Sequence, residues 1–162
     1  MEPILFILFG AIAVGGAIMV VTRKHPMASA LYLILTLFAV AALFVLRQAH
    51  FLAAIQVIVY AGAVVVLFIF VIMLINVPEN KLPMERLTGL RLLGVVVAGL
   101  LILETAILAR RFAMPAGPTA DAGSVQAVGR ALFTDYLLAF EITSVLLLAA
   151  VIGAIALAKR KI

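Results

Sequence analysis

Cysteine is absent from this sequence, and only two histidines occur. The chain therefore has no disulfide framework, no thiolate nucleophile and no cysteine ligands for a metal or an iron–sulfur cluster. His25 and His50 lie next to charged loop residues and are poor candidates for metal ligands. No phosphate-cradling glycine loop and no Ser/His/Asp set is present. The sequence contains no enzyme site of its own, so any redox chemistry must belong to partner proteins.

Charge is also scarce, because only 12% of the 162 residues are charged while 67% are hydrophobic. Soluble domains are closer to half apolar. The formal net charge is +5, but the basic residues flank apolar runs and form no single patch, which argues against nucleic-acid binding. The composition indicates an all-α polytopic membrane protein whose main contact is the lipid bilayer.

Five apolar runs are long enough to cross a membrane, since a helix needs about 20 residues to span ~30 Å of hydrocarbon. We expect one membrane domain over residues 1–162, with five transmembrane helices at about residues 3–22, 27–46, 51–75, 89–109 and 135–158. Glu2 has the wrong charge for the start of a signal peptide, so the first run is expected to be retained. Between the last two spans we expect an extended loop with a short helix from Val125 to Phe133.

The distribution of lysine and arginine predicts the orientation. Eight of these residues fall on one side of the five spans, namely Arg23, Lys24, Lys81, Arg86, Arg91, Lys159, Arg160 and Lys161. Four fall on the other side, namely Arg47, Arg110, Arg111 and Arg130. The more basic side is expected to be cytoplasmic. The N-terminus is then periplasmic and the C-terminus cytoplasmic.

The third span has an unusual composition. Gln56 and Tyr60 are four residues apart and are expected on one buried helix face. Gly62 weakens the helix locally, and the β-branched run that follows restricts side-chain rotamers. Such a segment could switch between α and π winding. The alternative is an ordinary packing helix with a glycine contact, which composition alone favours. If the segment is a gate, valine or leucine at position 62 should crowd the neighbouring helix and lower coupled activity.

Two glutamates lie within the apolar runs. Glu141, in the fifth span, is not expected to face lipid, and burial would favour its protonated form, which makes it a candidate proton carrier. The alternative is a structural acid that is hydrogen-bonded to a neighbouring helix. Glu104 is expected to reach the membrane interface near the end of the fourth span. Thr134 and Asp135 are expected to cap the start of the fifth helix.

The segment from Ala54 to Leu74 closely resembles the third helix of subunit J of bacterial respiratory complex I, NADH:quinone oxidoreductase. The mitochondrial counterpart is NADH dehydrogenase subunit 6. The specific part is the Tyr-Ala-Gly-Ala motif at residues 60–63. Two further stretches, from His25 to Ala30 and from Leu132 to Leu147, are similar, and the resemblance covers all five spans.

The resemblance implies a non-catalytic membrane-arm subunit in the bacterial inner membrane that binds no cofactor. NADH, FMN, iron–sulfur clusters and quinone would belong to partner subunits. The implied partners are the quinone-chamber subunit, the small K-type and A-type subunits and the antiporter-like subunits. In the family, a π-bulge in the third helix converts to α-helix during turnover and gates a hydrated proton path between the quinone-side chamber and the antiporter-like subunits. The matching gate positions are Tyr60, Gly62, Val64, Val65 and Phe68. Gln56 and Glu141 are further candidates for the proton path, because they are polar residues within apolar spans.

Two other functions remain open at this point. A free-standing ion or proton transporter would need its own binding site, and one tyrosine, one glutamine and two glutamates are few for that. No internal repeat is visible, which also argues against a repeat-built transporter. A passive scaffold subunit of another membrane complex would tolerate apolar replacements at Tyr60 and Glu141.

Overall fold

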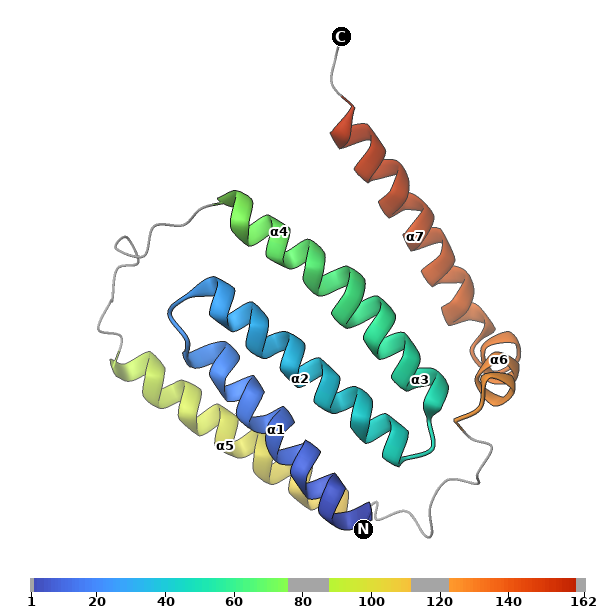
Figure 1. Ribbon diagram of the computed structural model, residues 1–162. Coiled ribbons are helices and arrows are strands. Elements are labelled where there is room, and N and C mark those ends of the chain that lie inside the picture. The colour runs from blue at the N-terminus through green and yellow to red at the C-terminus, as the bar shows by residue number, and fades with distance from the viewer. Residues whose placement is uncertain (1, 76–87, 112–122, 160–162) are drawn as a thin grey trace.

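A computed structural model describes residues 2–75, 88–111 and 123–159 of the chain (Figure 1). Its helices are α1 (Glu2–Thr22), α2 (Pro26–Leu46), α3 (His50–Ile55), the π-helix η1 (Gln56–Val64), α4 (Val65–Ile75), α5 (Thr88–Arg111), α6 (Val125–Phe133) and α7 (Leu137–Ala158). α3, η1 and α4 follow one another without a break and form one span of 26 residues. The predicted all-α class is confirmed.

Five helices in the described part of the chain are long and apolar enough to cross a membrane. They cover Glu2–Thr22, Pro26–Leu46, His50–Ile75, Leu93–Arg110 and Leu137–Ala158. The predicted number of spans and their approximate positions are therefore confirmed. Proline at the first position of α2 fits its start, because the amide that proline lacks has no partner in a first helical turn.

The expected capping of the fifth helix by Thr134 and Asp135 is wrong, although α7 starts within two residues of the expected position. The Thr134 hydroxyl donates a hydrogen bond to the Arg130 carbonyl at 2.8 Å, and the Thr134 amide donates to the Ala131 carbonyl. Both groups of Thr134 therefore complete the end of α6. The N-cap of α7 is Tyr136, which makes no side-chain capping hydrogen bond.

Three spans form the packed part of the molecule. α2 lies between α1 on one side and the α3–η1–α4 span on the other (Figure 1). Among the side chains that the structure describes, nearly all of the buried apolar ones are alanines: the set is Ala30, Ala39, Ala41, Ala53, Ala61 and Val65. Small side chains let helix backbones approach closely, which is how helices associate where lipid is as apolar as the protein.

α1 and α2 approach each other closely at Gly16. A methyl group on Gly16 would collide with the hydroxyl of Thr36, and it would lie 3.5 Å from the carbonyl oxygen of Tyr32. The Thr36 hydroxyl donates to that same carbonyl at 2.9 Å and is thereby held in place. Gly16 is the buried position of α1, so this pair sets how closely the first two spans pack.

The two remaining spans contact little of this layer. α7 packs on α6, and α5 makes no extensive contact with any other described helix. No residue of the span windows Leu93–Arg110 and Leu137–Ala158 is buried within the chain. Apolar surface of this extent must be covered by lipid or by helices of other proteins.

The turn between α2 and α3 is held by a specific hydrogen-bond pattern. Gln48 has a φ of 59°, in the left-handed region. The Gln48 amide donates to the Val45 carbonyl and the Ala49 amide donates to the Phe44 carbonyl, both at 2.9 Å. This is the Schellman arrangement that ends many helices. A methyl group on Gly123 would lie 2.6 Å from the Ala49 Cα, so the chain entering α6 rests directly on this turn.

The predicted short helix from Val125 to Phe133 is confirmed as α6. Its N-cap is Ser124, whose hydroxyl accepts a hydrogen bond from the Ala127 amide at 3.2 Å. Figure 1 shows α6 almost end-on beside the start of α7, so its axis runs across the direction of the spans.

Candidate functional site

The third span is wound as a π-helix over nine residues, Gln56–Val64, with Tyr60 at its centre. The Val65 amide donates to the Tyr60 carbonyl, five residues back, where an α-helix would bond four residues back. α-Helix precedes and follows this segment. The expectation of π winding near Tyr60 is therefore confirmed, and the third span is not an unbroken α-helix.

The candidate gate residues differ in exposure. Val65 is 2% exposed, whereas Tyr60, Val64 and Phe68 are 51%, 52% and 48% exposed. Gln56 is half-buried. The expected buried face of Gln56 and Tyr60 is thus not formed within this chain, because half of the tyrosine side chain is uncovered. The structure instead buries Ala61 and Val65, in elements that contact α2.

Gly62 has a different role from the one expected. A methyl group at this position would meet the carbonyl oxygen of Val57 at 3.3 Å, and no described atom of a neighbouring helix lies within 4 Å of it. Within the described helices a methyl group at this position meets no neighbouring helix, so the expected crowding by valine or leucine stays a prediction about longer side chains and partner subunits. The wide π turn brings the fifth preceding carbonyl close to the glycine, so a side chain there would oppose the π winding itself.

Both intramembrane glutamates are exposed within the chain. Glu141 is four residues after the first residue of α7, about 6 Å along the helix. Glu104 is seven residues before the last residue of α5, about 10 Å along that helix. Because α5 and α7 are consecutive spans and run in opposite directions, the two carboxylates lie toward the same membrane surface.

Hydroxyl groups near these carboxylates bond to their own helices. Thr105 donates to the Leu101 carbonyl, Thr143 to the Ala139 carbonyl and Ser144 to the Glu141 carbonyl, each at 2.7 Å. These hydroxyls are satisfied without a partner helix. The carboxylate of Glu141 has no partner within the described residues, so a group that pairs with it at membrane depth has to come from outside them.

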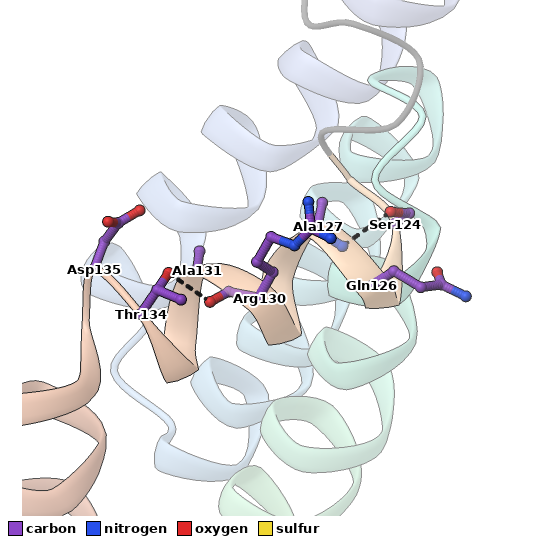
Figure 2. Close-up of a pocket in the computed structure, with 7 residues that line it drawn as sticks. All are labelled: Ser124, Gln126, Ala127, Arg130, Ala131, Thr134 and Asp135. Carbon is purple, nitrogen blue, oxygen red and sulfur yellow. Dashed lines mark hydrogen bonds between the residues drawn. The ribbon is translucent and has the colours of Figure 1, made fainter.

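Reasoning from the sequence overlooked a groove on α6 (Figure 2). It is lined by Ser124, Gln126, Ala127, Arg130, Ala131, Thr134 and Asp135. The spacing of these small and polar residues by three and four positions is the signal that could have revealed it, because such residues share one helix face. In the described ranges, no three histidine, aspartate or glutamate side chains gather into a possible metal site.

These observations define a class: a multi-span helical membrane protein whose third span carries a π-helix around a tyrosine. Its own residues offer a bendable helix and isolated carboxylates, and such features act in proteins that move protons or ions. Residues 16–157 match the family model described as NADH-ubiquinone/plastoquinone oxidoreductase chain 6. The chain belongs to this family.

Several curated relatives are similar over nearly the whole chain. The NAD(P)H-quinone oxidoreductase chain 6 of Nostoc sp. is 39% identical over 99% of this chain and 82% of its own length. The NADH-quinone oxidoreductase subunit J of Rhodobacter capsulatus is 37% identical over 96% of this chain and 80% of its own length. The subunit J of Escherichia coli (strain K12) is 35% identical over 92% of this chain and 82% of its own length.

Proposed function

We propose that this chain is a membrane-arm subunit of a proton-pumping NADH:quinone oxidoreductase, and that its third span gates a hydrated proton path. The path would connect the quinone-side chamber with the antiporter-like subunits. The observation that carries the proposal is the nine-residue π-helix centred on Tyr60 between two α-helical segments. A π-helix inside a membrane span is rare and frequently marks a functional site, and its change to α winding would move each amide of the segment from the fifth to the fourth preceding carbonyl.

Conversion of η1 to α-helix would rotate the following segment. A π turn contains one residue more than an α turn. When that extra residue is removed, the helix that follows rotates by roughly 100°, the angle between successive residues of an α-helix. Val65, now buried at 2% exposure, would leave the side that faces α2, and Phe68, now 48% exposed, would turn to a new side. A bulky apolar side chain that enters a narrow hydrated passage stops the water chain without any charge.

Tyr60 and Gln56 supply polar groups beside this segment. A hydroxyl hydrogen bond from Tyr60 to a group outside the chain would stabilise one winding by about 1 kcal/mol. A bias of that size shifts a two-state population several-fold. Because Tyr60 is 51% exposed, this group can approach from another subunit without any rearrangement of the chain. Glu141 would carry a proton, or hold water, at the side of the path nearest to α6.

The remaining parts of the proposal concern partners and orientation. The chain would be a non-catalytic subunit without a cofactor, and NADH, FMN, iron–sulfur clusters and quinone would be bound elsewhere in the complex. The quinone-chamber subunit, the small K-type and A-type subunits and the antiporter-like subunits would cover the exposed faces of α5, α7 and η1. The N-terminus would be periplasmic and the C-terminus cytoplasmic.

Two structures of the assembled complex test the gate, one at rest and one trapped during turnover. Residues 56–64 should be π-wound in one and α-wound in the other, with Phe68 facing different neighbours. The same winding and the same facing of Phe68 in both would reject the gate and leave a scaffold subunit. The resting structure also identifies the neighbours of α5 and α7.

Orientation can be tested separately, because the chain has no cysteine. In Lys159→Cys, a membrane-impermeant maleimide should react only from the cytoplasmic side. In Arg47→Cys, it should react only from the periplasmic side. The opposite pattern would invert the topology without affecting the gate.

A further inference from the structure

α6 has the form of a helix that lies in a membrane surface. Val125, Leu132 and Phe133 are 56%, 36% and 62% exposed and share one side of the helix. The ring of Phe133 packs edge-on against Phe140, with 5.0 Å between the centroids, and so joins α6 to the first turn of a membrane span. A short helix that runs across the spans, with an apolar side toward the start of α7, is held at the level of the lipid headgroups.

The opposite side of α6 carries the groove described above. Its two charged residues are Arg130 and Asp135, and its wall between them is made by small side chains such as Ala131. Figure 2 shows the guanidinium and the carboxylate rising on the same side of α6, with the Ala131 methyl between them. Neither side chain forms a hydrogen bond or an ion pair with any residue in the described ranges. The groove thus offers one cation and one anion that do not neutralise each other.

We propose that this groove binds the headgroup of an amine-bearing zwitterionic phospholipid, phosphatidylethanolamine. The lipid phosphate would accept hydrogen bonds from the Arg130 guanidinium, whose planar fork matches phosphate oxygens. The ammonium group would donate to the Asp135 carboxylate. Gln126 also lines the groove, but Figure 2 shows its side chain pointing away from Arg130 and Asp135, so the proposed contacts are those of the two charged residues.

Charge complementarity selects this lipid over others. Phosphatidylglycerol carries a phosphate but no amine, so Asp135 would meet only neutral glycerol hydroxyl groups and would lack a cationic partner. Phosphatidylcholine has a cation that cannot donate an N–H hydrogen bond, so its pairing with Asp135 is weaker. The position of α6 at headgroup level favours a lipid over a soluble phosphate ester with the same chemistry. The inference requires only that the chain is embedded in a membrane, and it is independent of the gate.

The test uses the complete complex in nanodiscs that contain phosphatidylethanolamine with a photoreactive group near the headgroup. After illumination, labelled peptides that cover α6 are quantified by mass spectrometry. Unlabelled phosphatidylethanolamine should compete with this labelling about tenfold better than phosphatidylglycerol, the ratio expected from one charge-assisted hydrogen bond. Soluble phosphoethanolamine should not compete at the same concentration. Equal competition by all lipids, or competition by the soluble ester, would overturn the proposal. Lipid label on a partner protein beside α6, with no label on the α6 peptides, would also overturn it.

Variants assign the two ends of the headgroup. Arg130→Gln should lower α6 labelling by about tenfold, and Arg130→Lys should restore part of it. Asp135→Asn should keep the labelling but abolish the preference for phosphatidylethanolamine over phosphatidylglycerol. Lys159→Gln, at the far end of α7, is the matched control and should change neither quantity. Unchanged lipid preference in Asp135→Asn would refute the assignment even where the variants of Arg130 fail to assemble.

Discussion

Gly123 lies so close to Ala49 that a methyl group on the glycine would come within 2.6 Å of the Ala49 Cα and 2.7 Å of the Gln48 carbonyl oxygen. Contacts this short do not occur between real side chains and backbone, and the atoms that would have to move belong to a turn fixed by two backbone hydrogen bonds. Ala49 immediately precedes α3, which leads into η1. The segment that enters α6 is therefore in direct contact with the base of the π-wound span.

Gly123→Ala should consequently destabilise the packing of α6 on the α2–α3 turn by about 1–3 kcal/mol, the usual cost of overpacking. The expected result is a lower midpoint for thermal release of this subunit from the purified complex. Gly129→Ala is the matched control, because a methyl group on Gly129 meets nothing within 4 Å. Alanine is the better helix former, so the control should be neutral or stabilising by up to about 1 kcal/mol. An equal effect of both substitutions would contradict the close contact.

The Gly16–Thr36 contact gives a second prediction. Gly16→Ala should separate α1 from α2, because the new methyl group would collide with the Thr36 hydroxyl. We expect a destabilisation of about 1–3 kcal/mol, measured as loss of the assembled subunit on heating. The double variant Gly16→Ala/Thr36→Ala should recover most of this loss, since it removes the colliding atom. Gly15→Ala should leave the thermal stability of the assembled subunit unchanged, because a methyl group on Gly15 meets nothing within 4 Å. Failure of the double variant to recover would place the strain elsewhere.

Gly62→Ala should favour α winding over π winding. The added methyl group would lie 3.3 Å from the Val57 carbonyl in the π-helix, which is a tight contact, whereas alanine is fully compatible with an α-helix. If η1 gates protons, the ratio of protons pumped to NADH oxidised should fall several-fold while oxidation continues. The control is Gly99→Ala in α5, where a methyl group meets nothing within 4 Å. An unchanged ratio together with unchanged winding in a structure of the variant would contradict the prediction.

Glu141→Gln tests the proton path near the membrane surface at which α6 lies. The substitution keeps shape and hydrogen bonding but removes the ionisable proton. We expect slower proton pumping per NADH oxidised, with an intact and correctly assembled complex. Glu104→Gln is the natural comparison, because that carboxylate lies toward the same membrane surface on another exposed helix. Normal pumping in Glu141→Gln would assign this residue a structural role only.

The five spans could be predicted from the sequence because each of them is a long apolar run with at most two charged residues in its most apolar window. The short helix α6 could be predicted as well, and its pattern is amphipathic within nine residues. Composition alone does not decide between α and π winding around Tyr60, whereas the family resemblance predicts the π winding. The errors have local physical causes. Asp135 and Thr134 looked like a helix start, but the Thr134 hydroxyl and amide already bond to α6. The contact of Gly123 with Ala49 joins residues far apart in the chain, and no periodic pattern encodes it.

The separation of α5 and α7 from the three-helix layer has a consequence for the life of the protein in the cell. A newly made copy can complete only part of its tertiary structure alone, because no residue in either span window is buried by the chain itself. Two of its five spans then present unpaired surfaces, and each of these two presents a carboxylate that has no partner among the described residues, until other subunits arrive. Such an orphan is the kind of substrate that membrane quality-control proteases remove. Its abundance should therefore follow the supply of its partners and not its own rate of synthesis.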